Sequence, residues 1–149
     1  MTDKLALAGI ALAPNAISFA LVMIFGGGSA CPESSLQPPG YVFGIAWTIL
    51  YLLYGVSMAI VYRNNDYDIL SSMCVLLIGM NLWWVIFGPI CMPVPALVTI
   101  LTLLVSCVIV VCKIYVNNKV AAGLLYPLVA WLTFASILSI QQVQLWMLE

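Results

Sequence analysis

Aromatic and amide side chains inside long apolar runs are the residues of this chain best suited to chemistry. Trp47, Tyr51 and Tyr54 recur at i, i+4 and i+7, which places their rings on one face of a helix. Asn81 and Trp84 share a face of another run at a spacing of three. Stacked rings favour a flat aromatic guest, and an amide can orient its polar edge. The pattern therefore indicates either packing within a helix core or a binding site for a planar, apolar small molecule.

Nothing resembling a hydrolytic or acid–base apparatus accompanies these rings. The 149-residue chain has no histidine, no cluster of carboxylates and no G-x-S-x-G motif. Its five cysteines form no C-x-x-C pair, so we expect no structural zinc site. Cys74 and Cys107 lie deep inside apolar runs as small buried hydrophobes, and Cys112 lies near a helix end. We expect Cys31 and Cys91 to be loop thiols on a shared side of the membrane.

The composition is that of a membrane protein. Hydrophobic residues make up 65% of the chain and charged residues only 6%, with a mean hydropathy of +1.18. In ordinary soluble domains about a quarter of the residues are charged. Four basic residues and a net charge of −1 argue against a nucleic-acid partner, which requires clustered Lys and Arg. We expect one domain, residues 1–149, in a lipid bilayer.

Apolar runs separated by Gly, Pro and Asn clusters predict five membrane-spanning helices. Each run is long enough to cross a hydrocarbon core of ~30 Å, and backbone groups in lipid must be satisfied within the segment. The first run exceeds the h-region of a signal peptide, so we interpret it as a retained helix. The fold class is an all-α bundle of five transmembrane helices, with spans near Leu5–Phe25, Tyr41–Tyr62, Ile69–Gly88, Pro95–Val116 and Val120–Met147.

The charged residues divide between the two sides of such a bundle. Glu33 and Glu149 fall on one side, and the four basic residues fall on the other: Lys4, Arg63, Lys113 and Lys119. The positive-inside rule would make the basic side cytoplasmic.

Three segments resemble the TspO/MBR family, the translocator proteins also called peripheral-type benzodiazepine receptors or tryptophan-rich sensory proteins. They are Gln37–Gly55 with its Pro-Pro-Gly-Tyr-Val-Phe and Trp-Thr-Ile-Leu-Tyr elements, Met80–Trp84 (Met-Asn-Leu-Trp-Trp), and Gly123–Ser139. The resemblance implies a pocket that aromatics of the second, third and fifth helices line, and a homodimer. Mitochondrial members place the first loop and the C-terminus in the cytosol, against the charge rule. The orientation and the membrane, mitochondrial outer or bacterial or host, therefore stay open.

The last predicted helix carries the remaining candidate site residues. Trp131, Ala135, Leu138 and Gln142 share one face, and Ser139 stands where the family has an asparagine. Pro127 is expected inside this helix, bending it. The first loop, Ser29–Gln37, lacks the tryptophans that the family carries in the loop that covers its pocket. We also expect the family-type sterol site to be absent, because its basic cholesterol motif follows the fifth helix and no basic residue lies between that helix and Glu149.

The leading interpretation is a membrane receptor or carrier that performs no chemistry of its own. Its ligand would be a porphyrin without a required cofactor or metal, with sterols or benzodiazepine-type drugs as further classes. The alternatives are a light- and oxygen-dependent porphyrin-degrading enzyme and a non-catalytic scaffold. Core packing is the competing role for Asn81 and the deeper tryptophans, and Trp146 suits an interfacial anchor. The predicted ligand-binding residues are Trp47, Tyr51, Tyr54, Asn81, Trp84, Trp131, Ala135, Leu138, Ser139 and Gln142.

Small residues at a spacing of four predict close approach between membrane helices. Gly40-x3-Gly44 and Gly55-x3-Ala59 have this spacing. Together with the resemblance, they predict a homodimer.

Overall fold

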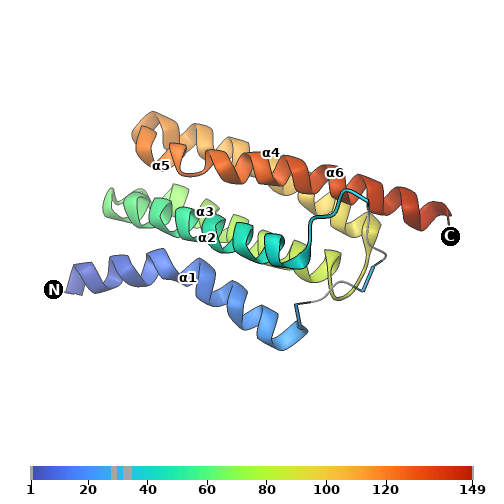
Figure 1. Ribbon diagram of the computed structural model, residues 1–149. Helices are drawn as coiled ribbons and strands as arrows, with labels where there is room; N and C mark the ends of the chain where they lie inside the picture. The colour runs from blue at the N-terminus through green and yellow to red at the C-terminus, as the bar shows by residue number, and fades with distance from the viewer. Residues whose placement is uncertain (1, 28–29, 32–34, 149) are drawn as a thin grey trace.

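The computed structural model describes residues 2–27, 30–31 and 35–148, and this part of the chain is almost entirely helical (Figure 1). Its helices are α1 (Thr2–Phe25), α2 (Gly40–Arg63), α3 (Tyr67–Phe87), α4 (Pro93–Asn117), α5 (Lys119–Gly123) and α6 (Tyr126–Leu148). Within the same residues, five segments are long and apolar enough to cross a membrane, and α5 with α6 forms the fifth. The predicted five-span fold is confirmed.

The helices form a bundle in which neighbours in sequence mostly run antiparallel (Figure 1). Helix α1 packs mainly on α2, whereas α4 packs on both α3 and α6. The core lies between α2, α3, α4 and α6, and the side chains of α1 are largely exposed. An exposed α1 is expected for a helix whose outer neighbours are lipid chains.

Prolines set where the helices begin and where they break. Pro39 precedes α2 and Pro93 begins α4, positions where a missing N–H costs nothing. Pro14 lies inside α1, which is visibly bent in Figure 1. The sequence predicted that Pro127 would bend a continuous helix, and this prediction is wrong. The fifth span is interrupted after Gly123, and Pro127 becomes the second residue of α6 because it cannot donate to a carbonyl one turn earlier.

A glycine allows α1 and α2 to cross at a short distance. A Cβ atom at Gly55 would collide with the backbone carbonyl of Ala11, so only glycine permits this approach. The Gly55-x3-Ala59 spacing is therefore used within the chain. A Cβ at Gly40 or Gly44 would meet no other atom within 4 Å.

The loops at each end of the bundle are tied to one another. Cys31 and Cys91 form a disulfide with a Cα–Cα distance of 5.2 Å, and the Ala30 N–H donates to the Gly88 carbonyl at 3.0 Å. At the opposite end, the Asn117 amide donates to the Asp66 carboxylate at 2.6 Å. The first and third loops thus share one end, and the second and fourth share the other, as a five-crossing topology requires.

Two expectations about the cysteines are wrong. Cys31 and Cys91 lie on a shared side, as expected, but they are bonded to each other and are not free thiols. Spacing in the sequence did not reveal how closely the two loops approach. Cys107 is buried as expected, whereas Cys74 is exposed on the outer surface of α3, where lipid would cover it. Glu33 and Glu149 lie outside the described residues.

Candidate functional site

A cavity of about 740 Å³ lies between α1 and α2, within the size range of small-molecule sites. Helix α1 forms one wall and α2 forms the other, and the Trp84 side chain of α3 completes the lining. Gly27 and Gly40, at the ends of α1 and α2, place its rim at the end of the bundle that holds the disulfide. The lining residues are Leu12, Asn15, Ala16, Ser18, Phe19, Val22, Gly27, Gly40, Phe43, Gly44, Trp47, Thr48, Tyr51, Leu52 and Trp84.

Polar side chains fix the two walls of this cavity relative to each other. With its amide oriented to satisfy both atoms, Asn15 donates to the Thr48 carbonyl at 3.2 Å and accepts from the Leu52 N–H at 3.1 Å. The Ser18 side chain of α1 lies close to the Tyr51 side chain of α2. Asn15 therefore joins α1 to α2, and both of its amide atoms are already used.

Aromatic rings form the inner wall, with Trp47 at their centre. The Trp47 ring centroid lies 5.3 Å from Tyr51, 5.9 Å from Trp83 and 6.4 Å from Trp131. Behind it, Trp83 stacks on Phe87 at 4.8 Å. Rings from α2, α3 and α6 thus meet at one point, at centroid separations at which aromatic pairs attract.

Three indole N–H groups of this cluster have no acceptor. The Nε1 atoms of Trp47, Trp83 and Trp131 are buried and form no hydrogen bond within the described part of the chain. Buried tryptophans usually find a partner for this donor, and leaving one unpaired costs about 1–3 kcal/mol. Trp47 lines the cavity whereas Trp83 and Trp131 pack behind it, so the cluster offers a ligand an apolar, aromatic wall with one unused donor at the wall and two in the layer behind.

The bundle brings together four of the predicted site residues. Trp47, Tyr51 and Trp84 line the cavity, and Trp131 contacts Trp47 and also Phe43, with a centroid distance of 5.5 Å to the latter. Their shared location matches the expectation that helices two, three and five contribute aromatics to one place.

The other predicted residues lie elsewhere in the bundle. The Tyr54 hydroxyl donates to the Met73 carbonyl at 2.7 Å and joins α2 to α3. The Asn81 amide donates to the Leu77 carbonyl of its own helix at 2.9 Å, so this bond is neither interhelical nor aimed into the cavity. The remaining four are buried on α6 and do not line the cavity: Ala135, Leu138, Ser139 and Gln142.

Trp83 and Phe43 belong to this site but were not predicted. Trp83 is fully buried, whereas its neighbour Trp84 is only partly so. A signal was present, because Trp83 follows Met73, Leu76 and Met80 at helical spacing on the buried face of α3. Phe43 precedes Trp47 by one turn and could have been included by the same rule.

The first loop can be placed only in part. Residues 28–29 and 32–34 lie outside the described residues, and with them much of Ser29–Gln37. Leu36, which replaces the family's last loop tryptophan, is about half exposed.

Comparison with known proteins identifies the lineage of this arrangement. The TspO/MBR family model matches residues 7–145. The chain is similar to the tryptophan-rich protein TspO of Archaeoglobus fulgidus, with 36% identity over 106 residues that cover 68% of each chain. It is also similar to the tryptophan-rich protein TspO of Chlorobaculum tepidum, with 29% identity over 118 residues, 76% of this chain and 75% of the relative.

Proposed function

This chain belongs to the TspO/MBR family, and from that premise we propose that it is a membrane receptor or carrier for a planar, hydrophobic ligand of the porphyrin type. The observation that carries the proposal is the cluster of three buried indole N–H donors without acceptors beside a cavity of suitable size. A porphyrin of the protoporphyrin type carries carboxylates at one edge of a flat aromatic body. Of the three donors, that of Trp47 belongs to a residue that lines the cavity, so it is the donor that such a guest can satisfy while its face contacts the ring.

The metal-free porphyrin is the preferred form of this ligand. The chain has no histidine, which is the commonest axial ligand to haem iron, so tight ligation would require a Tyr, Met or Cys. Shape and donor groups do not distinguish the free base from haem. Metal-free protoporphyrin should therefore bind at least as tightly as haem.

Quenching of tryptophan fluorescence tests the proposal. The purified protein is titrated in the dark with metal-free protoporphyrin and, separately, with haem. Saturable quenching by the free base, with an affinity no weaker than that of haem, is the expected result. Haem binding far more tightly than the free base would contradict it, and so would the absence of saturable quenching by either.

The same sample separates binding from turnover. After saturation, it is illuminated in air, and the porphyrin absorbance is followed against an equal amount of ligand in detergent alone. A carrier leaves the ligand spectrum as stable as in that control. Loss of absorbance that continues over several equivalents of ligand would instead establish a porphyrin-degrading enzyme.

Homodimer formation is the second part of the proposal. Only the family resemblance and the Gly40-x3-Gly44 spacing support it, because Gly55 is already used between α1 and α2. Sedimentation in mild detergent should give a dimer mass. Monomers across a wide range of protein-to-detergent ratios would contradict the proposal.

A further inference from the structure

A second hollow lies on the other side of α3, in the groove between α3 and α4. It has a volume of about 600 Å³ and is separate in its lining from the aromatic cavity. Val75, Val98 and Ile109, at its edges, are all more than half exposed, so this groove opens towards lipid. We call it the α3–α4 groove. Its lining residues are Ser71, Ser72, Val75, Leu76, Gly79, Val98, Thr99, Thr102, Leu103, Ser106, Ile109, Val110 and Lys113.

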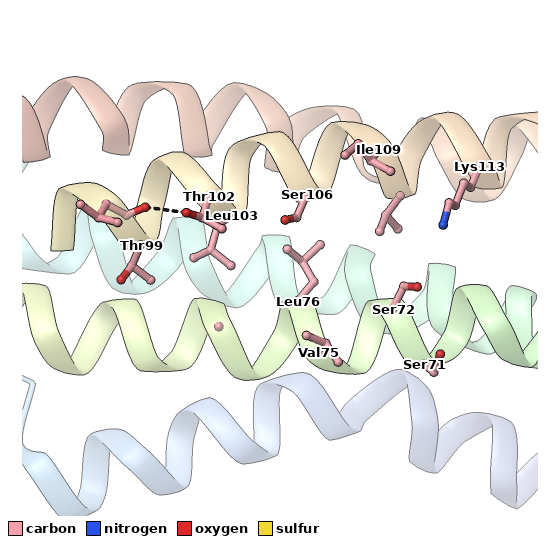
Figure 2. Close-up of a pocket in the computed structure, with 13 residues that line it drawn as sticks. Ser71, Ser72, Val75, Leu76, Thr99, Thr102, Leu103, Ser106, Ile109 and Lys113 are labelled. Atoms are coloured by element: carbon pink, nitrogen blue, oxygen red, sulfur yellow. Dashed lines mark hydrogen bonds between the residues drawn. The ribbon is translucent and has the colours of Figure 1, made fainter. Parts of the chain in front are cut away.

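One end of the α3–α4 groove is charged and polar. Lys113 extends from α4 towards Ser71 and Ser72 of α3 (Figure 2). Lys113 is four residues from the end of α4, and the serines are in the second turn of α3, so all three lie about 6 Å from their helix ends. Lys113 lies about 12 Å from the middle of α4, just inside the edge of a hydrocarbon core of ~30 Å, and its flexible side chain can reach the headgroup level.

Lys113 has no carboxylate partner in the described part of the chain. Asp68, one turn before Ser72, does not line the groove, and Asp66 accepts from Asn117 at the bundle end. A basic residue between two membrane helices near the headgroup level attracts anionic lipid heads. The charge at this end therefore fits a phosphate.

Ser71 and Ser72 also restrict which headgroup fits this end of the groove. The hydroxyls of Ser71 and Ser72 both donate to the Asp68 carbonyl, at 2.8 and 3.0 Å, so their protons are used. Their oxygens can still accept a hydrogen bond. A headgroup that carries its own hydroxyl donors beside the phosphate matches this arrangement.

The rest of the α3–α4 groove suits an acyl chain. Its floor is narrow at Gly79, where a Cβ would lie 2.6 Å from the Leu103 Cδ2 atom. Thr99 and Thr102 donate to carbonyls of their own helix, at 2.8 Å each, and present mainly methyl groups. Ser106 differs from them because its hydroxyl forms no hydrogen bond among the described residues, and it points towards α3 in Figure 2. It lies two turns deeper than Lys113, about 10 Å, where it can donate to a lipid ester carbonyl.

We propose that the α3–α4 groove binds one anionic phospholipid with a hydroxylated headgroup, of the phosphatidylglycerol type. Its phosphate lies at Lys113, its headgroup hydroxyl donates to Ser71 or Ser72, and one acyl chain follows the groove past Ser106.

Retention of lipid by the purified full-length protein tests this. The protein is equilibrated with mixed micelles that contain equal amounts of phosphatidylglycerol and phosphatidylcholine, and the bound lipid is identified by native mass spectrometry. Wild type should retain one phosphatidylglycerol in preference to phosphatidylcholine. Lys113→Gln should lower this preference about fivefold, the effect expected of one basic residue near the surface.

Matched controls separate a site from general attraction. Lys119 lies at the same end of the bundle but packs over the Tyr115 ring, outside the groove, so Lys119→Gln should leave the preference within twofold of wild type. Ser106→Phe should fill the groove and release the lipid, whereas Val116→Phe, on an exposed position outside the groove, should retain it. Equal losses in Lys113→Gln and Lys119→Gln would overturn the proposal, as would full retention in Ser106→Phe.

Two further measurements address the headgroup and the occupant. Phosphatidic acid has the phosphate but no headgroup hydroxyl, so it should be retained less than phosphatidylglycerol. Equal retention would overturn the role given to the serines. Efficient disulfide cross-linking of two copies through Val75→Cys would show that a second chain covers the groove, and would overturn the proposal as a whole.

Discussion

The aromatic cavity between α1 and α2 and the α3–α4 groove are similar in volume but differ in what their polar groups do. In the groove, four of the five hydroxyls donate to carbonyls of their own helices, and one cation lies at the membrane boundary. In the aromatic cluster, three buried N–H donors have no acceptor within residues 2–27, 30–31 and 35–148. Unused donors next to rings indicate a specific ligand, whereas satisfied hydroxyls in an open groove indicate a lipid. The state of the polar groups, and not the size of the hollow, separates the two sites.

Among the substitutions that test this difference between the two sites, replacement of Trp47 should have the largest effect on porphyrin affinity. Trp47→Ala removes the ring that contacts Tyr51, Trp83 and Trp131, and we expect porphyrin affinity to fall about 30-fold, the effect of losing the ~2 kcal/mol of a binding hot spot. Tryptophan quenching in the dark measures it. Lys113→Gln is the control, because it alters only the groove and should leave porphyrin affinity unchanged.

Trp47→Phe tests whether misfolding causes the loss of affinity in Trp47→Ala, since Phe retains a ring at the same position. Its affinity should lie between wild type and Trp47→Ala. If Trp47→Ala bound porphyrin as tightly as wild type while remaining folded, the cavity would not be the site.

The α1–α2 crossing should be the next most sensitive feature. Gly55→Val forces side-chain atoms against the Ala11 backbone, and overpacking of this kind costs about 1–3 kcal/mol. The thermal unfolding temperature in detergent should fall, and porphyrin affinity should fall with it because α1 supplies one wall of the cavity. Gly44→Ala is the matched control, since its Cβ meets open space and the melting temperature should be nearly unchanged. Equal destabilisation by both would contradict the close approach at Gly55.

Removing single indole donors should give smaller and more diagnostic effects. Trp83→Phe and Trp131→Phe keep a ring but lose an N–H that has no partner among the residues that the structure describes. Each should weaken porphyrin binding about three- to tenfold, while the ligand-free protein keeps or slightly gains stability, because an unpaired buried donor is removed.

Trp146→Phe, at an exposed position near the end of α6, should barely change affinity and serves as the control. A loss of ligand-free stability in Trp83→Phe without any loss of affinity would assign these rings to core packing alone.

The last test, chemical labelling of thiols, examines the topology and should have the smallest effect on ligand binding. In sealed vesicles, an impermeant thiol reagent should label neither Cys31 nor Cys91 until the disulfide is reduced, and should then label both from the same side. Cys107, buried in α4, should stay unlabelled throughout. Labelling of Cys31 and Cys91 from opposite sides would contradict the five-span topology.

The fold could be predicted from the sequence further than the site could. Apolar runs with Gly, Pro and Asn breaks are strong signals, so all five spans were located to within a few residues, apart from the break before Pro127. The site depends on which side of each helix faces which neighbour. Trp83 and Trp84 are adjacent, and only the packing of α3 against α2 shows that Trp83 meets Trp47. The Cys31–Cys91 bond joins segments far apart in the chain, and so does the close approach of Gly55 to the Ala11 backbone. Neither contact can therefore be predicted from local sequence.

The Cys31–Cys91 bond turns the middle of the molecule into a covalent ring. Because 60 residues separate the two cysteines, the ring contains the whole of α2 and α3 and the turn between them around Asn64 and Asn65. A protease that cuts this exposed turn would leave two fragments that stay joined on a non-reducing gel and separate after reduction. The aromatic rings of α2 and α3 would thus remain linked to α1 and α4 after the backbone is broken, and a nicked protein could still present an assembled site.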